Sequence, residues 1–194
     1  MARQTDMFAD HAAPEPKYPE GFRYRPELIT TAEERALLTH IRELPFREFE
    51  FHGYTGKRRV VSFGWKYDYG ERRIERVDDI PEFLLPLRSL AASFAELPPT
   101  ALQHSLVTEY SPGSAIGWHR DKAEFAEIVG VSLLAACTFR LRRAVGTRWE
   151  RVNLVAEPRS VYLLSGESRT AWEHSIPPVD ALRYSVTFRR LRAT

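Results

Sequence analysis

Tyr110-Ser-Pro-Gly-Ser-Ala-Ile-Gly-Trp-His119-Arg-Asp121 is the stretch on which the interpretation of this chain depends. His119 and Asp121 are two residues apart, so both side chains leave the same face of an extended strand end. An imidazole and a carboxylate that converge make two thirds of the 2-His-1-carboxylate triad that binds Fe(II) in non-haem oxygenases. The best candidate for the third ligand is His174 in Ser168-Arg-Thr-Ala-Trp-Glu-His174-Ser-Ile-Pro. The sequence therefore predicts an iron site formed by two separate segments.

The C-terminal run Arg183-Tyr-Ser-Val-Thr-Phe-Arg189 alternates polar with apolar side chains. Alternate side chains of a strand share one face, so we expect the polar ones to point into one cavity. These are Arg183, Ser185, Thr187 and Arg189. An inward arginine without an anion would be costly, and two arginines in one cavity could hold a dicarboxylate.

Composition limits the class of protein. A chain of 194 residues is long enough for one domain with a sizeable core. It carries 28 basic and 26 acidic residues, and the basic ones are nearly all arginine, which favours bidentate phosphate and carboxylate contacts. The single Cys137 excludes an intrachain disulfide and is typical of a reducing, cytoplasmic location. We expect no membrane segment, no secretion signal and no obligate protein partner.

Helix signals come first along the chain, and strand signals follow them. We expect a disordered leader over residues 1–17 and one domain over 18–194. A strand is predicted near Phe22, a helix begins with a capping box at Thr30, and a second helix covers Leu84–Leu97. Further strands are predicted over Gln103–Tyr110, Ile128–Leu134, Cys137–Arg143, Arg151–Ala156, Ser160–Leu164 and Arg183–Leu191. This order indicates an α+β domain whose C-terminal half is an antiparallel sandwich.

The segment Lys57–Arg73 interleaves basic and aromatic residues. Aromatic faces can stack on bases while arginines hold phosphates. The segment alone favours a plainer interpretation, a β-hairpin with one buried aromatic face and one solvated charged face.

Taken together, these motifs resemble the AlkB-like Fe(II)/2-oxoglutarate dioxygenases, the nucleic-acid dealkylases. The resemblance is close over residues 100–192 and loose around Trp65, and its motifs occur in the order of the family. They are Tyr110-Ser-Pro-Gly113, His119-Arg-Asp121, Val131-Ser-Leu133, Leu164-Ser-Gly-Glu-Ser-Arg169, His174-Ser-Ile176 and Arg183-x-Ser-x-Thr-x-Arg189. The resemblance implies a double-stranded β-helix, or jelly-roll, core with N-terminal helices packed against it and a substrate-lid hairpin.

The resemblance also implies roles for individual residues. Fe(II) would be bound by His119, Asp121 and His174, and the cosubstrate 2-oxoglutarate by Arg183, Arg189, Tyr110, Thr108, Ser185 and Thr187. Thr108 and Ser185 stand where the family has asparagine, which implies altered hydrogen bonds to the cosubstrate. Substrate contacts are expected from Phe63, Trp65 and Tyr67 in the lid, from Arg169, and from Glu124, which follows an alanine where some members have an acidic residue.

The implied activity is oxidative dealkylation of alkylated bases in DNA or RNA, which uses Fe(II), O2 and 2-oxoglutarate and releases succinate, CO2 and an aldehyde. One alternative with the same chemistry is a hydroxylase or demethylase of protein side chains or small molecules. A second alternative is a non-catalytic β-sandwich that binds nucleic acid through the arginine-rich hairpin. A non-catalytic protein has no need for His119, Asp121 and His174 together, so the ligand set favours an enzyme.

Overall fold

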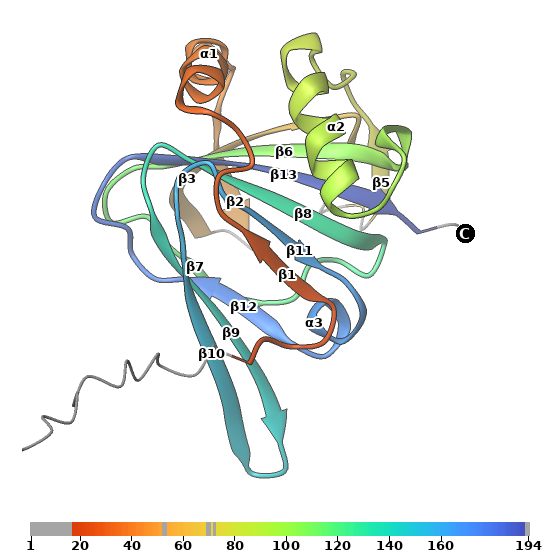
Figure 1. The fold of residues 1–194 in the computed structure, drawn as a ribbon, viewed down its shortest axis with the longest axis vertical. Coiled ribbons are helices and arrows are strands. Elements are labelled where there is room, and N and C mark those ends of the chain that lie inside the picture. Colours follow the sequence, from red (N-terminus) through yellow and green to blue (C-terminus); the bar gives the residue numbers. More distant parts are fainter. Residues whose placement is uncertain (1–16, 52–53, 69–70, 72, 193–194) are drawn as a thin grey trace, which may run out of the picture.

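Two antiparallel sheets form the body of the molecule (Figure 1). The structure, a computed structural model, describes residues 17–51, 54–68, 71 and 73–192. Except for Lys17, the predicted leader lies outside these residues. None of the described helices has the length and apolar content needed to cross a lipid bilayer.

The larger sheet has seven strands in the described part of the chain. In spatial order they are β1 (Phe22–Arg25), β11 (Val161–Leu164), β8 (Phe125–Leu133), β13 (Arg183–Leu191), β6 (Leu102–Tyr110), β3 (Tyr54–Phe63) and β2 (Arg47–Phe51). The smaller sheet consists of β10 (Arg148–Ala156), β9 (Cys137–Val145), β12 (Glu173–Ile176) and β7 (Ile116–His119). The jelly-roll core predicted from the sequence is confirmed. The short strands β7 and β12 carry the two histidines, and of the two only a strand end at His119 was expected from the sequence.

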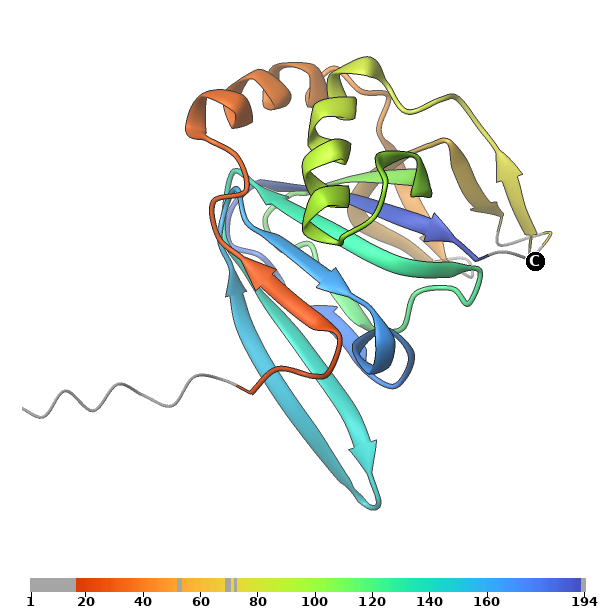
Figure 2. The same cartoon turned by 45° about the vertical axis from the view of Figure 1, so that its right-hand side comes forward.

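Helices cover the outer face of the larger sheet (Figure 2). Helix α1 (Thr31–Ile41) begins with the predicted capping box, in which Thr30 Oγ1 accepts from the backbone N–H of Glu33 and the Glu33 carboxylate accepts from that of Thr30. Helix α2 (Leu85–Phe94) ends earlier than predicted and follows the 3-10 turn η1 (Glu82–Leu84). The remaining short helices are η2 (Pro99–Ala101) and α3 (Gly166–Thr170).

Strand β13 shows how the period-2 pattern divides the interior. Its apolar residues Tyr184, Val186 and Phe188 pack in one core cluster with Ile41 of α1 and Leu87 of α2. Its polar residues face the other way, into the space between the two sheets. A second apolar cluster, which includes Phe139, Leu141 and Trp172, fills part of that space. The rest is left as a cavity lined by polar side chains.

The segment predicted as one hairpin over Lys57–Arg73 is divided at Gly64. Strand β3 before it joins the larger sheet, while β4 (Trp65–Asp68) pairs with β5 (Arg73–Arg76) in a separate two-stranded sheet. Gly64 has φ +76°, and a Cβ there would lie 2.0 Å from the carbonyl oxygen of Gln103. Glycine is therefore required at the point where the chain leaves the larger sheet.

Candidate active site

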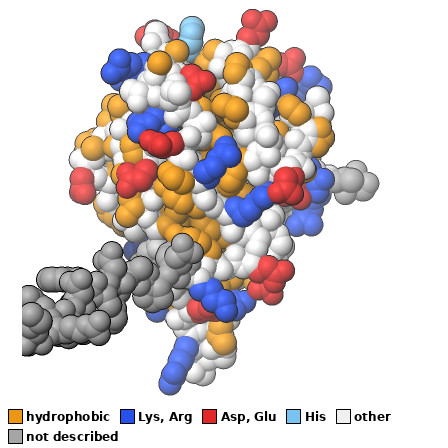
Figure 3. All heavy atoms as spheres, in the orientation of Figure 1, with side chains coloured by type: hydrophobic (Ala, Val, Ile, Leu, Met, Phe, Trp, Pro, Cys, Tyr) orange, Lys and Arg blue, Asp and Glu red, His pale blue; other side chains and the backbone are white. Residues whose placement is uncertain are grey.

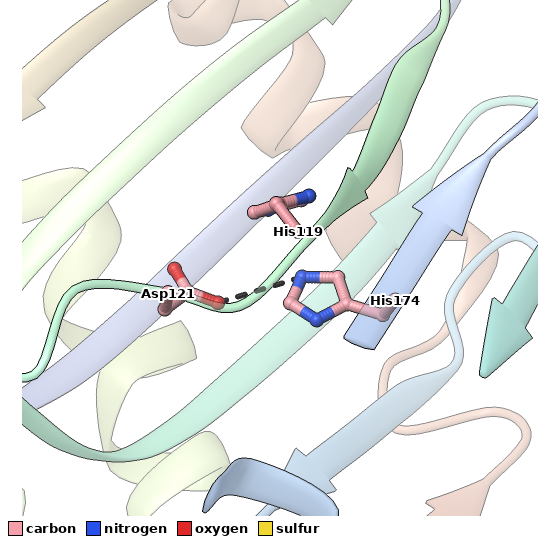
Figure 4. A group of neighbouring side chains, drawn as sticks. All are labelled: His119, Asp121 and His174. Carbon is pink, nitrogen blue, oxygen red and sulfur yellow. Dashed lines mark ion pairs between the residues drawn. The ribbon is translucent and has the colours of Figure 1, made fainter. Parts of the chain in front are cut away.

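The smaller sheet brings His119 and His174 together. In the register of β7 and β12 these two residues are direct cross-strand partners, and their ring centroids lie 4.2 Å apart. Asp121 follows β7 in the loop to β8, and its Oδ2 lies 3.4 Å from His174 Nε2 (Figure 4). One ligand atom of each residue lies within 4.8 Å of the others. Two imidazoles and one carboxylate at this spacing fit a divalent transition metal such as Fe(II).

Both imidazoles have a nitrogen available for a metal. His119 Nδ1 lies 2.9 Å from the carbonyl oxygen of Gly117. A carbonyl can only accept, so this contact assigns the proton to Nδ1 and leaves the Nε2 lone pair free. Burial, together with the neighbouring His119, lowers the pKa of His174 to about 3. His174 is therefore neutral at physiological pH, as a metal ligand must be.

Asp121 is held as a carboxylate by Arg189 of β13. Arg189 donates from Nε and Nη2 to Asp121 Oδ1, at 3.0 and 2.8 Å. Burial by itself would raise the pKa of Asp121, but the positive charge of Arg189 and the neighbouring His174 outweigh it, so this pKa lies well below its usual range. Because Oδ1 is occupied by the guanidinium, Oδ2 is the oxygen that faces the histidines.

Arg183 supplies an unmatched positive charge inside the cavity. Its side chain is only 2% exposed, and its Nη2 donates to Ser132 Oγ at 2.9 Å. Within the described residues, its Nε and Nη1 have no hydrogen-bond partner. The guanidinium carbon lies over the ring of Tyr110, 4.5 Å from its centroid. A buried guanidinium with two free donors fits a carboxylate, the group that a dicarboxylate cosubstrate would present.

One cavity of about 1410 Å³ contains both sets of residues. Its lining includes the three candidate metal ligands. It also includes all six residues expected to contact the cosubstrate, namely Thr108, Tyr110, Arg183, Ser185, Thr187 and Arg189. The structure thus brings the metal cluster and the cosubstrate residues into one space between the two sheets.

The residues expected to contact the substrate are dispersed. Tyr67 lines the cavity, with Lys122 Nζ 4.6 Å from its ring centroid. Trp65 instead lines a separate cavity of about 330 Å³ beside Gln103. Phe63 is buried in the core beneath the helices, because the β3 alternation turns it away from the cavity. The structure does not place Glu124 in the cavity lining either. Of the expected lid aromatics, only Tyr67 can reach a substrate there.

Arg169 stabilises the loop that carries Asp121 and is not part of the cavity lining. It is buried at the end of α3, where its guanidinium donates to the backbone carbonyls of Lys122, Phe125 and Ala126. All three lie within five residues of Asp121. Its donors are directed at the backbone of the loop after Asp121 and of the start of β8, so the contact of Arg169 with substrate stays a prediction.

Two further residues of the cavity were not predicted from the sequence. His104 Nδ1 lies 3.3 Å from Arg189 Nη1. His104, Thr108 and Tyr110 are an even number of residues apart on β6, so their side chains leave the same face of the strand and line the cavity. This even spacing from Thr108 and Tyr110 is the sequence signal that could have placed His104 in the cavity. Tyr162 lies against Gly130, where an added Cβ would be 2.2 Å from the tyrosine ring. No sequence signal indicated this close contact.

Residues 21–189 match the model of the 2OG-Fe(II) oxygenase superfamily, which covers both sheets and all three candidate ligands. The chain belongs to this superfamily. The superfamily uses Fe(II) and 2-oxoglutarate, so this oxygenase is an Fe(II)/2-oxoglutarate-dependent dioxygenase, as the sequence predicted.

AlkB homologues are among the relatives of this oxygenase. The "Alkylated DNA repair protein ALKBH8 homolog" of Arabidopsis thaliana is 29% identical over 89% of the chain. The mouse "tRNA (carboxymethyluridine(34)-5-O)-methyltransferase ALKBH8" is 26% identical over 88% of the chain. The structure of OsALKBH1 superposes with a TM-score of 0.66 at 18% identity and covers 90% of this chain and 99% of that one. The AlkB-like resemblance is confirmed. The chain spans 56% of the Arabidopsis relative and 26% of the mouse relative.

Proposed function

We propose that this dioxygenase removes alkyl groups from nucleobases of DNA or RNA. The observation that supports this substrate class is the charge around the cavity, whose lining combines the iron and cosubstrate residues with a basic margin. The basic residues there are Arg47, Arg58, Lys66, Arg120 and Lys122, against the acidic Glu48 and Asp78. A surplus of positive charge suits a polyanionic strand. The names of the relatives, which refer to alkylated DNA and to tRNA, point to the same class of polymer.

In this proposal His119, Asp121 and His174 hold Fe(II), and Arg183 receives the distal carboxylate of 2-oxoglutarate. When bound, iron and cosubstrate would supply an oxidation by O2, in which one oxygen atom becomes the hydroxyl group on the N-alkyl carbon and the other enters succinate as 2-oxoglutarate loses CO2. The C–N bond of the hydroxylated alkyl group then breaks, which returns a proton to the base nitrogen and releases an aldehyde. Arg189 keeps Asp121 ionised throughout, because its two donors remain on Oδ1.

The protein positions the base and limits access of water. A base reaches a cluster between two sheets only if it leaves the stack of its neighbours. Tyr67 and Lys122 lie together in the cavity lining, where an aromatic ring and a cation can contact a base and its phosphate. His119 and His174 line the same space, so the alkyl carbon of such a base can approach the iron site.

A panel of single- and double-stranded oligonucleotides with methylated or etheno-bearing bases tests the proposal. We expect loss of the adduct from at least one strand, with an equal amount of succinate, and no loss with His119→Ala. Peptides and free amino acids in parallel reactions serve as the competing substrate class. If only these stimulate succinate formation above the substrate-free rate, the enzyme is a protein or small-molecule hydroxylase instead.

A further inference from the structure

The hairpin formed by β9 and β10 projects beyond the body of the molecule (Figures 1 and 2). Its residues 137–156 include five arginines and a single acidic residue, Glu150. Basic side chains gather at its end, at the bottom of Figure 3. Glu150 is already paired with Arg143. Cys137, Phe139 and Ala156 at the base of the hairpin line the cavity, whereas Arg142, Arg143, Arg148 and Arg151 are not part of that lining. The hairpin therefore carries surplus positive charge on residues outside the iron and cosubstrate sites.

Some of this charge is held in an unfavourable arrangement. Arg142 and Arg151 are direct cross-strand partners, and like charges opposite each other destabilise a strand pair. Glu173 of β12 pairs with Arg142 on its other side, with Nε 2.7 Å from Oε2. Among the described residues, Arg151 has no carboxylate partner. Its positive charge therefore remains exposed beside the ion pair of Arg142 and Glu173.

Two tryptophans are stacked with these arginines on the outer face of the smaller sheet. The guanidinium carbon of Arg142 lies 4.3 Å from the ring of Trp118 and 4.1 Å from that of Trp149, so it is placed against both indoles. Arg140 adds a second guanidinium 4.9 Å from Trp118. Trp149 is 42% exposed although one face of its ring contacts Arg142. An exposed and pre-ordered aromatic surface beside free positive charge suits a nucleobase and its phosphate.

The stack begins at the edge of the active-site cavity. Trp118 precedes His119 on the edge strand β7 and belongs to the cavity lining. From β7 the outer face continues over β12 and β9 to β10. Arg142 of β9 contacts the rings of both Trp118 and Trp149, so the two indoles are neighbours on this face. A strand whose target base enters the cavity could follow this face for a few nucleotides.

We propose that the outer face of the β7–β12–β9–β10 sheet, from Trp118 to Trp149 and Arg151, binds the single-stranded nucleic acid that flanks the substrate base. This inference rests on the proposed function for the identity of the polymer. Trp149 stacks on a base and Arg151 contacts a phosphate. A stack that served only the stability of the hairpin would need neither the exposed face of Trp149 nor the unpaired Arg151.

The test measures binding of an unmodified, dye-labelled single-stranded oligonucleotide of about fifteen nucleotides by fluorescence anisotropy. Trp149→Ala is expected to weaken binding by about five- to a hundredfold, the range for loss of one base stack. Arg151→Ala should reduce the slope of log affinity against log salt by about 0.7, the value for one phosphate contact with a single strand. The matched control is Arg35→Ala, which removes an exposed arginine from α1 on the opposite side of the larger sheet.

Length dependence distinguishes this face from the cavity. A mononucleotide has a single base, which cannot occupy the cavity and stack on Trp149 at the same time, so Trp149→Ala should weaken its binding far less than that of the longer strand. Melting temperatures of the variants show whether each one is still folded. If Trp149→Ala is unfolded, Arg151→Ala tests the proposal independently. If Trp149→Ala or Arg151→Ala binds the longer strand as tightly as the wild type and the Arg35→Ala control do, the proposal is wrong. Because this binding requires no turnover, it remains measurable even if no alkylated base is a substrate.

Discussion

Arg189 directs two hydrogen bonds at a single oxygen of Asp121, from Nε at 3.0 Å and from Nη2 at 2.8 Å. The remaining terminal nitrogen, Nη1, lies 3.3 Å from His104 Nδ1. Both partners of the ion pair are nearly buried. The pair therefore connects the proposed metal ligand to strand β13, which also carries Arg183 at its other end.

We expect Arg189→Met to destabilise the metal-free protein by about 3–5 kcal/mol, because the buried Asp121 carboxylate loses its partner. The variant Asp121→Asn should recover part of that loss when it is combined with Arg189→Met, since the uncompensated charge is then absent. Urea unfolding of the wild type, the two single variants and the double variant gives the coupling free energy. Additive effects of the two substitutions would show that the pair contributes nothing to stability.

His104 should make stability dependent on pH. Burial, with the positive charge of Arg189, holds the pKa of His104 well below 6.5 in the folded state. The unfolded chain therefore takes up a proton near pH 6.5 that the folded protein does not bind, so stability is full above that pH and falls below it. From pH 7 to pH 5, wild type should lose about 1–2 kcal/mol more than His104→Gln, which keeps an acceptor for Arg189. Equal losses for the two proteins in urea unfolding would contradict this assignment.

The alternation of β13 explains why much of the site could be predicted from the sequence. A strand with period 2 has only two faces, so Arg183 and Arg189 had to share one if the run was a strand. The pairing of His119 with His174 could not be predicted, because it depends on the register between two short strands that are 54 residues apart. The jelly-roll connection that makes them neighbours is a property of the whole fold.

The positions of the expected substrate residues could not be predicted from the sequence for a related reason. Phe63 and Trp65 lie on either side of Gly64, where the chain passes from one sheet to another. A change of sheet interrupts the alternation, so the faces of the flanking aromatics could not be assigned from spacing. The hydrogen bonds of Arg169 could not be predicted either, because the sequence pattern of side chains does not show which ones donate to backbone carbonyls.

Arg183 should behave as a binding group whose charge is unfavourable in the empty protein. Two of its buried nitrogens have no partner in the described residues. Arg183→Met should therefore leave the stability of the cosubstrate-free protein unchanged or raise it. The same change should weaken 2-oxoglutarate binding by roughly ten- to a hundredfold, because it removes a hydrogen-bonded charge partner worth about 1.5–3 kcal/mol.

Thermal melting with Mn(II), with and without 2-oxoglutarate, measures both effects on Arg183→Met. Wild type should gain stability from the cosubstrate, whereas the variant should not at the same concentration. A variant that melts much lower than wild type without ligand, yet gains as much from 2-oxoglutarate, would assign Arg183 to the structural core.

The loop between β7 and β8 should depend on Arg169. Its guanidinium bonds to the Lys122 carbonyl in that loop and to the Phe125 and Ala126 carbonyls at the start of β8, so Arg169→Ala removes several charged hydrogen bonds, worth about 1.5–3 kcal/mol each. We expect a stability loss of about 3 kcal/mol or more and a weaker affinity for Fe(II), because Asp121 lies in the loop. Arg120→Ala is the matched control, since Arg120 is exposed and donates one bond to the Thr170 carbonyl. If both variants bind metal and unfold alike, Arg169 does not position the loop.

The last prediction concerns the substrate side, where the structure separates two neighbouring aromatics. Tyr67 lines the main cavity beside Lys122, whereas Trp65 lines the smaller cavity near Gln103. Tyr67→Ala should therefore remove a base contact of about 1–3 kcal/mol and lower kcat/KM for an alkylated oligonucleotide by about five- to a hundredfold. Trp65→Ala should reduce kcat/KM far less and act mainly on the melting temperature, because its ring packs away from the cavity. Dealkylation, succinate formation without substrate, and melting are measured on both variants. If Trp65→Ala has the larger effect on dealkylation at unchanged melting temperature, Trp65 rather than Tyr67 contacts the base in the working enzyme.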